Sequence, residues 1–390
     1  MTTPQFSIPE ARRLLNDLFA HRPAIYWTDF LVSLTIGYSC AAVYLNAPLG
    51  SPQQIVCMGI AIFALFRVGS FIHEIVHFGR NEMRAFTVAW DLLAGVPMLM
   101  PSFFYGNHID HHNTHHYGTG QDGEYLPLGS GPLRNIAKFY AQVIILPLLV
   151  AVRFLIITPI SFLHPRLREW ALRYCSSYVI NLRYRRKRIP ADAPRRYWAF
   201  LEVLCFLRTA AIFVFVFAGW APWYRIPLLY LLAMCVLGLN YVRNVVAHLY
   251  QGDGQPMSHA EQLLDSVNLE GGRWGGPITE LFFPLGLRYH ALHHLFPALP
   301  YHNLYAAHRR LMAELPADSA YRQTVYPHFW AALRLLWKNS RQAVAESGPN
   351  RPTRADVWFE NRRRLLASYK AADHPPLPAE DPTAPVVETA

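Results

Sequence analysis

Residues 289–304 read Tyr-His-Ala-Leu-His-His-Leu-Phe-Pro-Ala-Leu-Pro-Tyr-His-Asn-Leu and contain four of the 18 histidines of the chain. His290, His293 and His294 stand at i, i+3 and i+4, the spacing that places side chains on one face of a helix. Imidazole is a preferred ligand of iron, zinc, copper and nickel. The stretch therefore predicts a short helix that presents several metal ligands together.

The same spacing recurs upstream of this stretch. His108-Ile-Asp-His111-His112 repeats the pattern, His73-Glu-Ile-Val-His77 is an i, i+4 pair, and Asn244-Val-Val-Ala-His248 adds another. Eleven of the 18 histidines fall in the windows 73–77, 108–116, 248 and 290–294. A lone buried histidine is usually a hydrogen-bonded core residue, which does not explain this density. Because one metal ion accepts only about four to six ligands, nine or more histidines predict two ions.

The second window has two readings. His112-Asn-Thr-His115-His116 satisfies the same pattern as His108–His112. We prefer 108–112 for the ligands and keep His115 and His116 as alternates or as neighbours that support the ligands.

The composition indicates a membrane protein. The 390 residues are 52% hydrophobic and only 16% charged, where a typical soluble domain has about 25% charged residues. So much apolar surface excludes a disordered or fibrous chain. The five cysteines show no metal or redox spacing, which is typical of free thiols in a reducing compartment.

Four apolar segments are long enough to cross a bilayer: 24–46, 54–72, 200–220 and 226–248. Short turns join them into two hairpins. Two further apolar stretches, 85–105 and 139–162, contain prolines and charged residues. We expect these not to cross but to be interfacial or re-entrant, with a tight hairpin as the alternative for 139–162.

The charge pattern orients this arrangement. The net charge is +10, and residues 164–198 contain ten Lys or Arg between two long apolar segments. The positive-inside rule makes this a cytoplasmic loop that contacts anionic lipid head groups, and a nucleic-acid partner is not expected. His73, His77 and His248 then all lie on the cytoplasmic face.

The predicted fold is an all-α integral membrane protein with about four transmembrane helices in two hairpins. A cytoplasmic helical cap holds the histidine-rich site. The expected divisions are an amphipathic N-terminal segment at 1–23, the membrane domain at 24–310, surface helices at 311–370 and a disordered tail at 371–390.

The ordered set of histidine motifs resembles the three histidine boxes of membrane fatty acid desaturases and their hydroxylase relatives, over roughly residues 25–310. The continuation His-His-Leu-Phe-Pro is similar to the desaturase form, and Tyr117–Pro127 is similar to a bacterial subgroup. Box one is His73–His77, box two is His108–His112 and box three is His290–His294. Box one has three intervening residues, where the animal acyl-CoA enzymes have four.

This resemblance implies two iron ions as cofactors, O2 as co-substrate and a bacterial inner-membrane location. It also implies that Asn244 holds a water on one metal. The implied ligands are His73, His77, His108, His111, His112, His248, His290, His293 and His294.

Acidic residues beside the boxes are candidates for orienting the imidazoles, because ligating histidines usually donate their other N–H to a carboxylate or carbonyl. These are Glu74, Asp110, Asp122 and Glu124. For Asp122 and Glu124, a solvated loop acid is an equal alternative.

The leading functional hypothesis is desaturation of a fatty acyl chain linked to a lipid or a carrier protein. The chain has no Cys-rich iron–sulfur pattern, haem motif or dinucleotide fingerprint, so electrons are expected from a separate ferredoxin or rubredoxin. The basic stretch 164–198 is a candidate dock for that donor, with head-group contact as the alternative.

Three other hypotheses compete with desaturation. The same fold can support a hydroxylase or ketolase acting on an acyl chain, a terpenoid or a carotenoid. A histidine-lined metal transporter would place its ligands near the bilayer midplane rather than at helix ends. A zinc protease is suggested by His73-Glu-x-x-His77, but it would need only one further ligand and would leave the other boxes idle.

Overall fold

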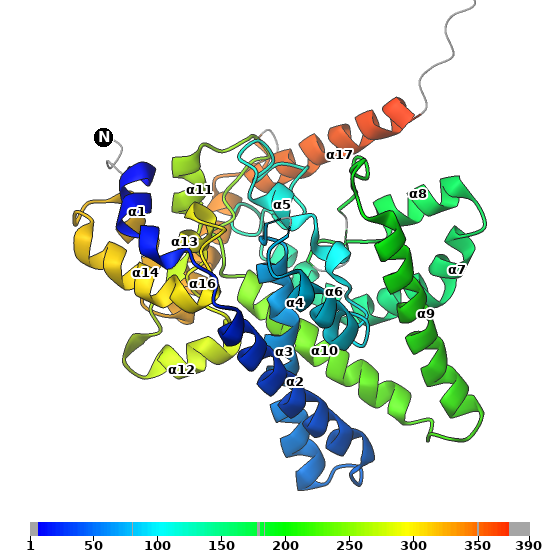
Figure 1. Cartoon of the computed structure of the whole chain (residues 1–390). Coiled ribbons are helices and arrows are strands. Elements are labelled where there is room, and N and C mark those ends of the chain that lie inside the picture. The colour runs from blue at the N-terminus through cyan, green and yellow to red at the C-terminus, as the bar shows by residue number, and fades with distance from the viewer. Residues whose placement is uncertain (1–6, 80, 178–179, 183, 349–350, 374–390) are drawn as a thin grey trace, which may run out of the picture.

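The computed structural model describes residues 7–79, 81–177, 180–182, 184–348 and 351–373 (Figure 1). Residues 1–6 of the predicted N-terminal segment and residues 374–390 of the predicted tail lie outside the described residues. The helices before the cap are α1 Ile8–Leu14, η1 Asn16–Leu18, α2 Pro23–Asn46, α3 Pro52–Ile75, α4 Arg84–Trp90, η2 Asp91–Gly95, η3 Ser102–Tyr105, α5 His108–His111, α6 Arg134–Val152, η4 Arg153–Ile157, α7 Thr158–Ser161, α8 Pro165–Tyr174, α9 Arg195–Phe217 and α10 Arg225–Asn244.

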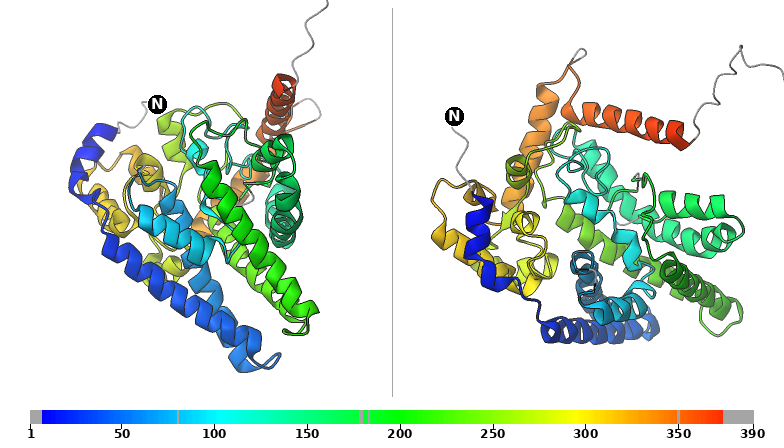
Figure 2. Two further views of the ribbon diagram at one scale, coloured as in Figure 1. Left: turned by 45° about the vertical axis from the view of Figure 1, so that its right-hand side comes forward. Right: turned by 45° about the horizontal axis from the view of Figure 1, so that its top comes forward.

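Helices α2 and α3 form an antiparallel pair that projects from the rest of the molecule (Figures 1 and 2). Each begins with a proline at its first turn, where the missing N–H is tolerated, and the Ser51 side chain also caps α3 by accepting from the Gln54 backbone N–H. Each has 24 residues, so each is about 36 Å long and exceeds the apolar thickness of a bilayer.

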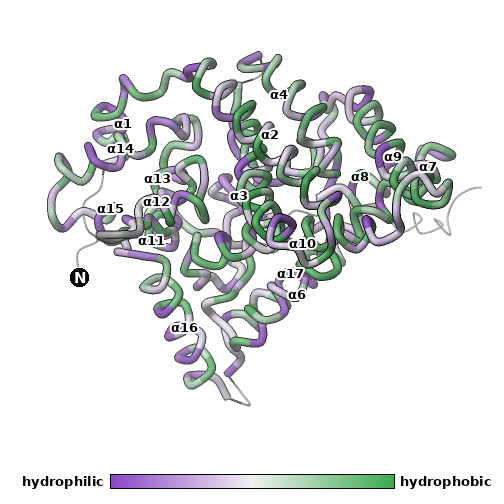
Figure 3. The backbone as a smooth tube through the Cα atoms, turned by 90° about the horizontal axis from the view of Figure 1, so that it is seen from below, coloured by the Kyte–Doolittle hydropathy of each residue, from purple (hydrophilic) through white to green (hydrophobic). Residues whose placement is uncertain are grey.

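Helices α9 and α10 are joined by a turn at their projecting ends and diverge from it, and α10 packs against α3 and α6 rather than against α9. The turn between them exposes Trp220 and Trp223, which is typical of an aromatic belt at a membrane interface. Figure 3 shows long hydrophobic stretches along α2, α3, α9 and α10. These four helices correspond to the four segments that the sequence predicts to cross.

Five helices of the described chain are long and apolar enough to span a membrane, and the fifth is Arg134–Ser161. The alternative of a tight hairpin for 139–162 is wrong, because α6, η4 and α7 follow one another as a continuous 28-residue helix. The expectation that this stretch does not cross stays a prediction, and the helix is long and apolar enough to span. Two features make this helix tolerable. The π-helical turn η4 joins α6 to α7 without ending the helix. The buried Arg153 pairs with Glu202 and donates to the Cys175 carbonyl at 2.8 Å, so its charge has partners.

The other irregular stretch, 85–105, contains only short elements and no candidate span. The π-helical η2 begins at Asp91, whose carboxylate accepts from the Ser102 backbone N–H at 2.7 Å and from the Tyr197 hydroxyl at 2.9 Å. These bonds fold the stretch back on itself beside α3.

The cap shares one hydrophobic core with the membrane helices, which contribute residues such as Phe30, Phe71 and Tyr241 to it. Its elements are α11 His259–Asp265, β1 Asn268–Leu269, α12 Gly272–Phe282, α13 His290–Leu295, α14 Tyr301–Glu314, α15 Ala320–Gln323, β2 Val325–Tyr326, α16 Phe329–Ala345 and α17 Arg354–Asp373. Strands β1 and β2 pair in parallel over two residues each. This small sheet fixes the segment 265–269, which lies between His248 and α13.

Candidate metal centre

Box one lies where α3 leaves the apolar region. His73 is on the last turn of α3, and His77 is on the turn that follows. Neither ring nitrogen of His73 has a hydrogen-bond partner in the described chain, although both nitrogens are buried, and the same holds for His77 Nε2. Buried polar atoms without partners are rare and call for a ligand.

Box two is held by two carboxylates. His108 and His111 lie on the one-turn helix α5 and are buried. The Nδ1 atom of His108 lies 2.7 Å from Glu124 Oε1, and that of His111 lies 2.9 Å from Asp122 Oδ2. An imidazole Nδ1–H donating to a carboxylate leaves the Nε2 lone pair free for a metal.

Asp122 also organises the loop that carries it. Its carboxylate accepts from the backbone N–H groups of Gly118, Glu124 and Tyr125 at 2.8–3.1 Å. One fully buried side chain therefore fixes both the loop and the orientation of His111.

His248 is oriented by residues that the sequence patterns did not reveal. Its Nδ1 lies 2.8 Å from the Tyr117 hydroxyl and 3.2 Å from Ser266 Oγ, and Tyr117 donates to Asp265 Oδ2 at 2.8 Å. Tyr117 uses its single proton on Asp265, so it accepts the Nδ1–H of His248. The sequence signals for Tyr117 were that it directly follows the second histidine window and that it begins the stretch Tyr117–Pro127, which is similar to a bacterial subgroup.

Box three is held by the segment after Asp265. The backbone N–H of Ala291 donates to the Val267 carbonyl at 3.2 Å, and the Leu292 N–H donates to Asn268 Oδ1 at 3.2 Å. Asn268 is fully buried and also binds Thr324. Segment 265–269 thus fixes α13 relative to His248.

The eight histidines of the three boxes meet with His248 in two groups. We call His73, His77, His108, His112 and His293 the five-histidine group, and His111, His248, His290 and His294 the four-histidine group. Within each group the ligand atoms lie within 4.8 Å of one another.

The separations inside the groups match metal coordination. In the four-histidine group, His248 Nε2 is 2.9 Å from that of His290 and 3.1 Å from that of His111. In the five-histidine group, His112 Nε2 is 2.9 Å from that of His108 and 3.0 Å from that of His293. Two imidazole nitrogens bound at about 2.1 Å and at right angles around one metal would be roughly 3 Å apart.

The electrostatics also suit metal binding. Burial lowers the pKa of His77 to about 3, and burial together with the charge of neighbouring histidines lowers the pKa of His248 and His293 well below the usual value. These imidazoles are therefore neutral, which is the form that binds a metal. Burial also opposes charge on His111, but the Asp122 carboxylate outweighs it and the pKa of His111 is raised.

Several other candidates lie outside both groups. His115 is exposed, and His116 Nδ1 lies 2.9 Å from Asp110 Oδ1. Asp110 also accepts from the Tyr184 hydroxyl, while Glu74 accepts from the Tyr26 hydroxyl and the Tyr301 N–H. In the described chain, Asp110 and Glu74 thus bind groups other than the nine imidazoles. Asp122 and Glu124, in contrast, each contact one of the nine imidazoles, those of His111 and His108.

Asn244 lies at the last residue of α10, one turn before His248. It is buried, and its Nδ2 atom has no hydrogen-bond partner among the described residues.

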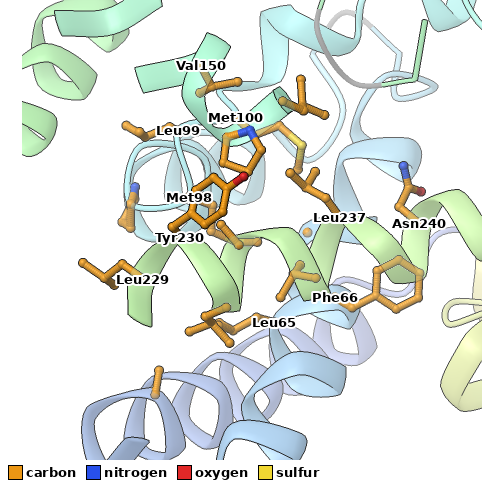
Figure 4. A pocket seen from close by; sticks show the side chains of 18 of the residues that line it. Leu65, Phe66, Met98, Leu99, Met100, Val150, Leu229, Tyr230, Leu237 and Asn240 are labelled. Atoms are coloured by element: carbon orange, nitrogen blue, oxygen red, sulfur yellow. The ribbon is translucent and has the colours of Figure 1, made fainter. Parts of the chain in front are cut away.

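A cavity of about 550 Å³ leads to the centre. Its wall is mainly apolar and comes from α2, α3, α6, α9, α10 and the stretch 97–105 (Figure 4). Of the nine histidines, His73 alone lines it. A long apolar chain in this cavity would thus reach the five-histidine group.

Comparison with known proteins agrees with this architecture. The family model described as fatty acid desaturase matches residues 49–326, so the chain belongs to the fatty acid desaturase family. The chain is an oxidoreductase of the desaturase and hydroxylase type, with several candidate membrane helices and a clustered histidine site.

A particular relative is a ceramide hydroxylase of Caulobacter vibrioides (strain NA1000 / CB15N). It is 37% identical over 343 residues, which cover 87% of this chain and 95% of the relative.

Proposed function

We propose that this chain is a di-iron, O2-dependent membrane enzyme that hydroxylates a long-chain lipid of the ceramide class. The observation that carries this proposal is His73, which belongs to the five-histidine group and also lines the apolar cavity. The similarity to a ceramide hydroxylase over nearly its whole length supports the choice of reaction and substrate.

The proposed iron ligands are the two histidine groups, one group for each ion. Asn244 lies four residues before His248, which belongs to the four-histidine group. We therefore propose that Asn244 holds a water molecule on the iron ion of that group. Two iron ions bound there would supply the oxidising power, from O2 and two electrons, that attack on an unactivated C–H bond requires.

The other residues of the chain act by positioning. Glu124, Asp122 and the Tyr117–Asp265 pair hold Nδ1–H atoms, which directs Nε2 lone pairs inward. The cavity wall excludes water and aligns the lipid chain, so that one carbon of the chain faces His73. The fully buried carboxylate of Asp122 keeps the loop of box two in register with α5.

Desaturation is the second candidate. It is favoured by the sequence His-His-Leu-Phe-Pro after box three and by the description of the matching family. Both reactions begin at one C–H bond, and the placement of the neighbouring carbon decides whether oxygen is inserted or a second hydrogen is lost.

The electron donor in this proposal is a separate ferredoxin- or rubredoxin-type protein that approaches the cytoplasmic face of a bacterial inner membrane. Exposed cations such as Arg188 and Arg196 suit an acidic donor.

The test is expression in a bacterial host that makes ceramides but has no lipid hydroxylase or desaturase of its own. Extracted lipids are compared by mass spectrometry with those from a host expressing the His293→Ala/His294→Ala variant, which removes one ligand from each group. We expect a ceramide that has gained one oxygen atom in the wild-type host only.

A ceramide or fatty acyl chain that has instead lost two hydrogens would establish desaturation. If purified, iron-loaded protein consumes no O2 with any supplied reductant, the proposal is overturned and metal transport becomes the leading alternative.

A further inference from the structure

The wall of the cavity contains a polar pair that the proposed chemistry does not use. Asn240 and Arg243 lie on the last two turns of α10 and both line the cavity, among apolar neighbours such as Val236 and Leu237. Polar groups inside an apolar cavity usually fix the orientation of a ligand.

Arg243 determines how the amide of Asn240 is turned. Its Nε and Nη2 atoms donate to Asn240 Oδ1 at 3.4 and 3.2 Å. A guanidinium has donors only, so the oxygen of Asn240 must face it and the NH2 group must face away. Among the described residues, the Nδ2 atom of Asn240 donates to no acceptor. Figure 4 shows Asn240 on α10 at the edge of the cavity.

This arrangement is anchored close to the candidate metal centre. Asn240 and Asn244 stand at i and i+4 on one face of α10, about 6 Å apart along the helix axis. Arg243 is itself buried, and it lines the cavity together with His73. An oxygen atom bound by Asn240 would therefore lie near the end of the cavity that His73 occupies.

We propose that Asn240 Nδ2 donates a hydrogen bond to a carbonyl or hydroxyl oxygen of the lipid substrate, with Arg243 as the positioning residue. This inference rests on the proposed function and deepens it, because it fixes which part of the lipid is oxidised. The polar part of the lipid is held at Asn240, so the carbon that reacts is one near the polar group, and the remaining chain extends along α9 and α10.

The decisive variant is Asn240→Leu, which keeps the approximate volume and removes the donor. One neutral hydrogen bond contributes about 0.5–1.5 kcal/mol, so we expect KM for a ceramide to rise roughly 3- to 10-fold. We also expect the new hydroxyl to spread over several carbons, because the chain loses its fixed register. Asn240→Gln keeps a donor, so its KM should lie between those of the wild type and Asn240→Leu. Its hydroxyl should also be spread over fewer carbons than in Asn240→Leu.

Two substrate analogues identify the bound oxygen. One lacks the hydroxyl groups of the ceramide, and the other has the amide carbonyl reduced to a methylene. The wild type should bind one of them roughly 3- to 10-fold more weakly than the ceramide, whereas Asn240→Leu should not distinguish that analogue from the ceramide.

The matched control is Asn46→Leu, the same chemical change at the far end of α2 and outside the cavity wall. It should leave KM and product position unchanged. Iron content and thermal stability are measured for every variant, since a purely structural role of Asn240 would change these instead.

The inference is overturned if Asn240→Leu, folded and iron-loaded, keeps both the wild-type KM and the single product position. Displacement of a fluorescent ceramide gives a second readout that needs no turnover. If the wild type binds this probe but forms no product, the proposed function fails. A weaker affinity of Asn240→Leu for the probe would still support the inference, and an equal affinity would overturn it.

Discussion

The two histidine groups are held in place in different ways. In the four-histidine group, His111 is fixed by Asp122, and His248 by Tyr117 and Ser266. In the five-histidine group, His108 alone has such a partner. Among the described residues, buried ring nitrogens without a partner occur on His73, His77 and His112 in this group and on His290 in the other. The group that meets the apolar cavity therefore has more candidate ligands and fewer orienting hydrogen bonds. A larger ligand set can replace orienting bonds, whereas a smaller set depends on them.

Removal of a ligand should have the largest effect and should differ between the groups. His294→Ala leaves three histidines in its group, whereas His77→Ala leaves four. We expect both variants to lose at least about 100-fold in activity, and His294→Ala to lose iron more readily. The measurement is iron per chain during stepwise chelation, together with product formation.

His116→Ala is the matched control, because His116 lies near box two but outside both groups. It should retain both iron ions. If it loses iron as His294→Ala does, the ligands of box two are misassigned.

The next effect compares the two carboxylates of box two. Asp122→Asn and Glu124→Gln should each lower iron affinity or activity roughly 10- to 100-fold, because each replaces the charged carboxylate beside one Nδ1–H with a neutral amide, which is a weaker acceptor. Asp122→Asn should also destabilise the fold by about 1–3 kcal/mol, since Asp122 accepts three backbone N–H groups. Iron titration and thermal unfolding separate the two effects, and equal unfolding temperatures would contradict the role of Asp122 in the loop.

Tyr117→Phe should produce a smaller effect that is confined to the four-histidine group. It removes the hydroxyl between His248 and Asp265, while Ser266 still contacts His248 at 3.2 Å. We expect about a tenfold loss of iron affinity at one of the two ions. The measurement is the release of iron from this variant and from the wild type. We expect the release from the variant to be biphasic. Uniform weakening of both ions would show that the two groups do not behave independently.

The smallest effect concerns His308, a buried histidine in neither group. Its Nδ1 lies 2.7 Å from the Tyr321 hydroxyl, and burial lowers its pKa to about 4. Between pH 4 and the ordinary value near 6.5, the unfolded chain binds a proton that folded His308 does not, so stability falls as the pH is lowered through this window. The contribution is at most about 1.4 kcal/mol per pH unit.

His308→Phe should reduce this slope without loss of iron. Unfolding of the wild type and the variant, measured at several pH values in detergent, provides the check. An unchanged slope would mean that His308 is not the titrating group.

Local spacing predicted that i, i+4 pairs such as His108 and His112 come together, because these positions share a helix face whatever the rest of the chain does. It did not predict that the i+3 residues His111 and His293 each join the other group. Spacing could not predict Tyr117, Asp265 or Asn268, since their contacts join segments far apart in sequence. The prediction for 139–162 was wrong about a hairpin for a related reason. Pro147 and Arg153 read as breaks, but a π turn and the buried partner Glu202 let the helix continue.

The compact histidine site also constrains how the chain threads the bilayer. Between His112 and His248 the chain contains three candidate spans, Arg134–Ser161, α9 and α10. Both ends of this interval meet at one site, so the number of complete crossings between them must be even. If α9 and α10 each cross once, Arg134–Ser161 makes no complete crossing, and both ends of this continuous helix lie on the same side of the bilayer. Cysteine labels on either side of Arg134–Ser161 should accordingly react from the same compartment.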